Sequence, residues 1–307
     1  MKNVTKTNIL FTFMVASYLL LIYIVRLIPA DVLNINIRLI LPELIMLLPA
    51  FLYVTVLKPD NLGRINFSFP SLTNVIKIIL FTFCVMPFIT ILNSISSIFV
   101  ENHAANTMSY LTSNPLWLNI LFIALIPAVC EEYLFRGLLF HGYKKRNPLK
   151  AVLMSSLLFG LIHMNVNQFV YAFVMGCILC MLVYITGTVL SSMIAHFIFN
   201  GINVVLSYYS ENMLKEYEAA GGEEIVLSAS DYVIAYGIQI TLAALGLVLA
   251  YMLFKSICRE NRGMENIKLI FKKENRSQYD ESQGRFFDAY IAVGIILCMI
   301  YICFYGL

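Results

Sequence analysis

The chain reads Ala128-Val-Cys-Glu-Glu-Tyr-Leu-Phe-Arg-Gly137 in the middle of an apolar stretch. Ionisable side chains are unfavourable in lipid, by about 2.5 to 3.5 kcal/mol for a charged residue at the centre of a helix on insertion scales. Two adjacent glutamates and an arginine in one short membrane segment therefore need a reason to be there. This cluster decides how the rest of the sequence is interpreted.

The composition around the cluster is that of a membrane protein. Of the 307 residues, 60% are hydrophobic and 13% are charged, and the mean hydropathy is +0.80. Apolar runs of about 17–25 residues have the length of a bilayer span. The sequence therefore predicts an all-α fold, a polytopic transmembrane helix bundle of about nine spans that forms a single membrane domain over residues 1–307. The predicted spans are 9–28, 39–57, 78–100, 116–140, 149–164, 169–185, 189–208, 232–254 and 286–305.

The positive charges predict the orientation of these spans. If the N-terminus is cytoplasmic, only Arg26, Arg38 and Lys215 of the 21 lysines and arginines fall in outer segments, and Arg136 lies within a span. Cytoplasmic segments are enriched in lysine and arginine. We therefore predict a multi-pass protein of the cell membrane with a cytoplasmic N-terminus and an external C-terminus. Topology accounts for the basic inner segments, and the net charge of +3 gives no indication of a nucleic-acid partner.

Two longer segments separate spans in the second half of the chain. Residues 211–231 are predicted to form an acidic outer loop, and residues 255–285 a basic cytoplasmic loop. Within the basic loop, the run 267–273 has the pattern of a short amphipathic interfacial helix. A solvated loop is nevertheless the expected structure, because the topology alone explains its charge.

The cluster has a helical spacing that separates its two glutamates. Residues four apart on a helix share one face, so Glu132 is placed to pair with Arg136. Glu131 is rotated by about 100° from Glu132 and points elsewhere. One carboxylate is thus predicted to be tied to a cation, while the other is free for chemistry. A further carboxylate, Glu43 in the second span, is predicted to be interfacial or to face a pore.

Two polar pairs lie in nearby spans. Phe159 and His163 share a face of the fifth span, and His196 and Asn200 share a face of the seventh. Each pair alone is also explained by hydrogen bonding between helices. Two histidines and a free carboxylate on three spans, however, need partners that only one another or a water-filled cavity can supply. The sequence therefore predicts that these spans build one polar site.

The three patterns resemble those of the CAAX protease and bacteriocin-processing family, also called CPBP or Abi, whose members are intramembrane proteases. That family carries Glu-Glu-x-x-x-Arg, Phe-x-x-x-His and His-x-x-x-Asn/Asp on successive spans, in that order. The same order is found here at residues 131–136, 159–163 and 196–200. The resemblance covers residues 116–208 and implies a four-span catalytic core that hydrolyses peptide bonds.

The resemblance also implies a role for each motif residue. Glu131 would be the general base that activates water, helped by His163, and His196 with Asn200 would stabilise the oxyanion. Glu132 is also predicted to belong to the catalytic set, where it would support the other residues.

The remaining motif residues, Arg136 and Phe159, would give structural support. The implied substrate is a peptide or a lipidated protein at the lipid bilayer, with C-terminally prenylated CAAX proteins as one candidate.

The motif set is compatible with two kinds of mechanism. Peptide hydrolysis needs an activated water, an oxyanion donor and a proton for the leaving amine, so the favoured mechanism requires no cofactor. The alternative is a metalloendopeptidase in which Glu131, His163 and His196 bind a divalent ion such as Zn²⁺, because two histidines and a glutamate can form a catalytic zinc site. The sequence contains no His-Glu-x-x-His zinc motif.

Two other function classes are open at this point. A non-catalytic membrane scaffold or immunity protein would use the fold without the chemistry, but it would have no need for a free buried carboxylate. An ion- or proton-coupled transporter would use the same residues as a relay. The sequence shows no inverted repeats or paired broken helices of the kind that many transporters contain.

Overall fold

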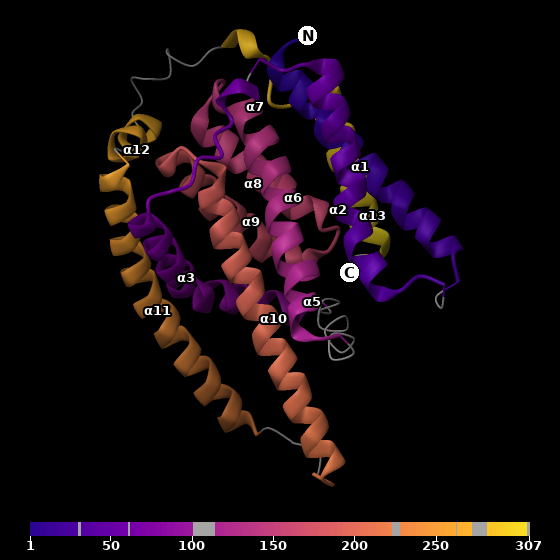
Figure 1. The fold of residues 1–307 in the computed structure, drawn as a ribbon, viewed down its shortest axis with the longest axis vertical. Coiled ribbons are helices and arrows are strands. Elements are labelled where there is room, and N and C mark those ends of the chain that lie inside the picture. The colour runs from indigo at the N-terminus through magenta and orange to yellow at the C-terminus, as the bar shows by residue number, and fades with distance from the viewer. Residues whose placement is uncertain are drawn as a thin grey trace.

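The fold is a bundle of helices (Figure 1). The computed structural model describes residues 1–29, 32–60, 62–100, 114–222, 228–261, 263–271 and 281–305. Within these ranges every regular element is a helix, and no β-strand occurs. The predicted all-α, polytopic fold is therefore confirmed.

The elements follow the order of the predicted spans. A composite helix over residues 116–144 carries the glutamate cluster and consists of five consecutive segments. The elements are α1 (Asn3–Leu27), α2 (Ile35–Leu52) with η1 (Tyr53–Leu57), η2 (Leu62–Arg64), α3 (Leu72–Phe99), the composite helix α5 (Leu116–Asn119), η4 (Ile120–Leu125), α6 (Ile126–Glu132), η5 (Tyr133–Phe140) and α7 (His141–Lys144), then α8 (Pro148–Ile162), α9 (Val166–Thr186), α10 (Val189–Ala219), α11 (Ala229–Glu260), α12 (Gly263–Phe271), η7 (Glu281–Gln283) and α13 (Ala289–Tyr305).

Seven of the described helices are long and apolar enough to cross a membrane, and two are shorter. The shorter ones are α8 and α13, with 15 and 17 residues. At about 1.5 Å of rise per residue, α8 is shorter than the hydrocarbon core of a bilayer, which is about 30 Å thick. All nine predicted spans thus correspond to apolar helices, although two of them fall short of full spanning length.

The predicted outer loop at 211–231 is wrong for most of its length. Helix α10 continues to Ala219, through residues such as Glu216 and Lys215 that favour helix. Gly221, with a φ of +83°, follows the end of the helix. On the other side, Ser228 and Asp231 form a capping box that starts α11. The described part of the connection is therefore mostly helical, and residues 223–227 lie outside the described residues.

The predicted solvated loop at 267–273 is also wrong where the structure describes it. Helix α12 spans Gly263–Phe271 and lies against α9 and α11. Gly263 is buried, and Met264 and Ile267 pack against the apolar core. Burial of this apolar face favours the helix. Residues 272–280, which include part of the predicted basic loop 255–285, lie outside the described residues.

Small residues allow the closest helix contacts. A Cβ added at Gly246 of α11 would collide with the backbone carbonyl of Cys84 in α3. In the same way, Gly176 of α9 faces Ser156 of α8, and Gly160 of α8 faces Phe169 of α9. Membrane helices associate through such close packing, because lipid provides little hydrophobic drive between them. The α3–α11 and α8–α9 pairs are therefore held by backbone proximity.

Segments that the charge pattern assigns to the cytoplasm meet at one end of the bundle. The side chain of Asn3 bonds to Asp60 and Gln283, and Arg146 donates to the carbonyl of Gly284. Asn66 donates to the carbonyl of Gly187. Loops that are distant in the sequence thus lie at the same end of the bundle, because successive helices run in alternating directions. The orientation of that end relative to the cell stays a prediction.

Candidate active site

The glutamate cluster lies in an irregular part of the composite helix. Segments η4 and η5 are π-helical, and only the seven residues of α6 between them are α-helical. The sequence predicts one regular helix here, which is incorrect. Pro127 at the start of α6 lacks the N–H that would bond four residues back, which favours an irregular helix. π-Helical turns are frequent at functional sites.

The two adjacent glutamates have different surroundings. The side chain of Glu132 is completely buried, whereas that of Glu131 remains 13% exposed. Glu132 Oε1 lies 2.7 Å from Arg136 Nη1, and the arginine is itself fully buried. The ion pair that the spacing predicts is therefore present. A buried charge of this kind is tolerated only with a partner.

Arg136 also connects the cluster to α8 and α9. Its guanidinium carbon lies 4.3 Å from the centre of the Phe159 ring, in a cation–π contact. Its Nη2 donates to the carbonyl of Gly176, at 3.4 Å. Phe159 in turn meets the ring edges of His163 and His196, with centroids 5.0 and 6.0 Å away. Phe159 is thus the apolar centre around which the three motifs gather.

His196 bridges the two glutamates. Its Nδ1 lies 2.9 Å from Glu132 Oε1, and its Nε2 lies 3.8 Å from Glu131 Oε2. An ionised carboxylate only accepts hydrogen bonds, so Nδ1 must carry the hydrogen in this contact. Nε2 of the neutral ring is then an acceptor that faces Glu131, and it becomes a donor when the ring is protonated. Glu132 therefore sets the tautomer of His196.

His163 lies at the end of α8 and not within it, because the helix ends at Ile162. Its Nδ1 lies 2.8 Å from the carbonyl oxygen of Phe159, which can only accept a hydrogen bond. Nε2 of the neutral ring is again left as an acceptor. The next residue, Met164, has a φ of +55°, which turns the chain into α9. The sequence predicts the shared position of Phe159 and His163 but not the helix end.

Asn200 has a structural contact that the sequence does not reveal. Its Nδ2 donates to the carbonyl of Ile123, at 3.3 Å. Pro127 stands four residues after Ile123 and has no N–H, so this carbonyl lacks its usual helical donor. Asn200, which lies one turn after His196 on α10, thus supplies this carbonyl of the irregular helix with a hydrogen-bond donor. One of its two amide hydrogens is used in this way.

Glu43 of α2 is a further ionisable residue inside the helix bundle. It is only 6% exposed, and its Oε2 has no hydrogen-bond partner among the described residues. Helix α2 packs against α6, the helix that carries Glu131. The interfacial alternative is wrong, because the side chain is buried within the bundle, and the pore-facing alternative stays a prediction. The sequence feature that could have identified Glu43 is a lone carboxylate inside an apolar span.

The metal site that the sequence leaves open stays a prediction. Among the residues the structure describes, no group of three or more His, Cys, Asp or Glu is arranged to hold a metal ion. The Nδ1 atoms of His163 and His196 contact a backbone carbonyl and Glu132, which leaves Nε2 of each ring as the nitrogen that could bind a ligand. We derive no step through a metal from this arrangement.

Comparison with known proteins adds one finding. Residues 113–202 match a family model described as type II CAAX prenyl endopeptidase Rce1-like. The matched segment contains all three motifs. No curated protein and no solved structure matches the chain.

Proposed function

We propose that the protein is an intramembrane endopeptidase, on the premise that residues 113–202 match the model of the Rce1-like family of type II CAAX prenyl endopeptidases. Its apolar helices make it a multi-pass membrane protein. The observation that carries the proposal is the contrast between two neighbouring carboxylates. Glu132 is fully buried and contacts both Arg136 and His196, whereas Glu131 keeps some exposure and faces the other nitrogen of His196.

Glu131 is the proposed general base. A general base must be reached by water and be free of a fixed cation, and Glu131 meets both conditions better than Glu132. In the proposed reaction Glu131 takes a proton from water, and the resulting hydroxide attacks the scissile carbonyl carbon. Glu131 then gives this proton to the leaving amine. His163 is the proposed helper, because Nε2 of its neutral ring can accept a hydrogen bond from the other hydrogen of the attacking water.

His196 and Asn200 are the proposed oxyanion donors. Donors that are fixed in advance stabilise the charge that develops on the carbonyl oxygen. His196 can donate from Nε2 only when both ring nitrogens carry hydrogen, and Glu132 balances the charge of that form. Asn200 keeps one amide hydrogen beyond the one it donates to Ile123. Glu132, Arg136 and Phe159 support these groups by holding the His196 ring and the helices around it.

The proposed substrate is a membrane-associated peptide or lipidated protein, and a C-terminally prenylated CAAX protein is the form that the family description favours. The proposed orientation has the basic end of the bundle in the cytoplasm. This orientation follows the charge distribution between the loops.

The experiment is cleavage of a quenched fluorescent farnesylated CAAX peptide by the full-length protein in detergent. We expect Glu131→Gln to lower the rate by at least about 100-fold, the lower end of what general-base catalysis contributes. The matched control is Glu216→Gln, which removes an exposed carboxylate near the end of α10 and should leave the rate unchanged.

Each other outcome has a definite meaning. Equal cleavage by wild type and Glu131→Gln would exclude Glu131 as the base. Cleavage of the same peptide without its farnesyl group would exclude prenyl recognition but not proteolysis. Loss of activity with a chelator, and its return with Zn²⁺, would support the metal alternative. Proton or ion flux in proteoliposomes without cleavage would favour a transporter.

A further inference from the structure

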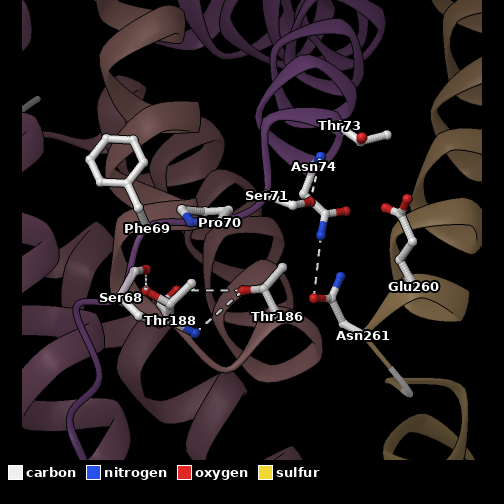
Figure 2. A pocket seen from close by; sticks show the side chains of 10 residues that line it. All are labelled: Ser68, Phe69, Pro70, Ser71, Thr73, Asn74, Thr186, Thr188, Glu260 and Asn261. Carbon is white, nitrogen blue, oxygen red and sulfur yellow. Dashed lines mark hydrogen bonds between the residues drawn. The ribbon is translucent and has the colours of Figure 1, made fainter.

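A cavity of about 420 Å³ lies outside the candidate site, at the end of the bundle where the segments assigned to the cytoplasm meet. It is lined by the segment that leads into α3, the junction of α9 and α10, and the end of α11 (Figure 2). Its lining residues are Ser68, Phe69, Pro70, Ser71, Thr73, Asn74, Thr186, Thr188, Glu260 and Asn261. Thr188 precedes His196 by eight residues, which corresponds to about 12 Å along α10. Nothing in the proposed reaction uses this cavity.

Asn74 is the most informative residue of the lining. It is only 4% exposed, and its Nδ2 donates to Asn261 Oδ1, at 3.3 Å. Its Oδ1 has no hydrogen-bond partner among the described residues. Buried polar atoms normally have a partner, so this acceptor calls for a donor. Figure 2 shows the amide of Asn74 and the carboxylate of Glu260 pointing toward one another across the cavity.

The first turn of α3, which also carries Asn74, offers donors. Helix α3 begins at Leu72, and Ser71 caps it by accepting from the backbone N–H of Asn74, at 3.2 Å. The first N–H groups of a helix have no acceptor within the helix and favour an anion. The hydroxyl groups of Ser71 and Thr73 stand beside them and are exposed. An anionic group of a ligand fits this turn.

The cavity therefore has two sets of groups, one suited to an anion and one suited to a cation. The start of α3 suits an anion, while Asn74 Oδ1 and Glu260 suit a cation that carries N–H donors. Lys77 lies 3.0 Å from one oxygen of Glu260, and this pair stands at the edge of the cavity. A ligand with a phosphate and a primary ammonium a few bonds apart would satisfy both sets.

Apolar side chains beside the cavity show what else the ligand carries. Phe69 and Leu72 are 79% and 75% exposed, and Ile76, one turn further along α3, is 50% exposed. On a membrane protein these side chains contact acyl chains. A polar cavity that opens next to them suits an amphiphile, whose head group enters while its tails lie along α3.

We propose that this cavity binds the head group of a phospholipid with a primary ammonium, that is, phosphatidylethanolamine. Its ammonium donates to Asn74 Oδ1 and Glu260, and its phosphate lies at the start of α3. The proposal does not depend on the proposed protease activity.

The test measures thermal unfolding of the purified full-length protein in mixed micelles that contain one added lipid. Phosphatidylethanolamine, phosphatidylcholine and phosphatidylglycerol are compared at equal mole fraction and with equal acyl chains. We expect the largest rise in Tm with phosphatidylethanolamine, because phosphatidylcholine has no N–H donor and phosphatidylglycerol has no cation. Equal rises with all three lipids, or the largest rise with phosphatidylglycerol, would overturn the proposal.

Variants locate the effect. We expect Asn74→Leu and Glu260→Gln each to weaken the apparent affinity for phosphatidylethanolamine about tenfold, and Glu216→Gln to leave it unchanged. The Tm without added lipid shows whether each variant is folded, and the lipid preference of wild type stands as a test even if Asn74→Leu is not. Glycerophosphoethanolamine, which lacks acyl chains, distinguishes a lipid from a soluble ligand. If it stabilises the protein as well as the lipid does, the membrane part of the proposal is wrong.

Discussion

Two arginines have the same contact in two different regions of the molecule. In the motif-bearing core, the guanidinium of Arg136 lies 4.3 Å from the centre of the Phe159 ring. In the peripheral pair of α1 and α13, the guanidinium of Arg26 lies 4.4 Å from the centre of the Tyr305 ring. Arg136 is fully buried and paired with Glu132, whereas Arg26 is exposed. The geometry of the contact is equal, but the surroundings are not.

Whole helices differ in the same way. Helices α9 and α11 have nearly equal mean hydropathy, yet 44% of the apolar window of α9 is buried inside the protein and only 17% of that of α11. Lipid is as apolar as a protein core, so hydropathy does not distinguish a helix that faces lipid from one that faces protein. The buried polar residues make the distinction, because they need partners that lipid cannot provide.

From the comparison of the two arginines, we expect the largest loss of stability when Arg136 is replaced. We expect Arg136→Met to lower the free energy of unfolding by about 3–5 kcal/mol, because it leaves Glu132 buried without its cation. The matched change Arg26→Met should lower it by less than about 1 kcal/mol, as for an exposed cation–π contact. Unfolding by SDS titration measures both. Equal losses would show that burial is not what separates the two regions.

Replacing both Glu132 and Arg136 tests whether the unpaired buried charge is what lowers stability. We expect Glu132→Leu combined with Arg136→Met to be more stable than Arg136→Met alone by about 2 kcal/mol or more, because no buried charge is left unpaired. Cleavage of the farnesylated peptide should stay low, since His196 has lost the carboxylate that sets its tautomer. Recovered activity together with recovered stability would mean that Glu132 has no part in orienting His196.

Outside the motif-bearing core, Gly246 of α11 is a position where we expect a substitution to lower stability. We expect Gly246→Ala to destabilise the protein by about 1–3 kcal/mol, because the added Cβ collides with the carbonyl of Cys84 and α3 and α11 must separate. The control is Gly237→Ala on the same helix, where nothing lies within 4 Å of the added Cβ. That change should be neutral or stabilising by up to about 1 kcal/mol. Thermal unfolding of the two variants compares them directly, and a tolerated Gly246→Ala would contradict the close packing.

The smallest expected change in stability concerns Glu43. We expect Glu43→Leu to raise the free energy of unfolding by about 1 kcal/mol, because a buried carboxyl oxygen without a partner is unfavourable. Cleavage should stay unchanged, since Glu43 has no part in the proposed reaction. SDS titration and peptide cleavage are measured on the same preparation. A loss of stability would show that Glu43 has a favourable partner in the native protein.

The sequence predicts much of the site and less of its geometry. The spacing of Glu132 and Arg136 predicts their ion pair, since four residues return a helix to the same face. The same reasoning treats residues 116–140 as one regular helix, and therefore misses both π segments and the bond from Asn200 to Ile123. It also misses the contact between His196 and Glu132, because these residues are 64 positions apart. Local periodicity carries no information about such pairs.

The sequence by itself determined that this is a helical membrane protein, because long apolar runs exclude most other states of the chain. It also determined which polar residues are exceptional, since each charge in a span stands out against its apolar neighbours. Only the tertiary structure decided that Glu132 holds His196, that Glu43 is buried, and which helices face lipid. Those outcomes depend on how helices pack against one another, and in a bilayer apolar side chains are equally stable against lipid and against protein.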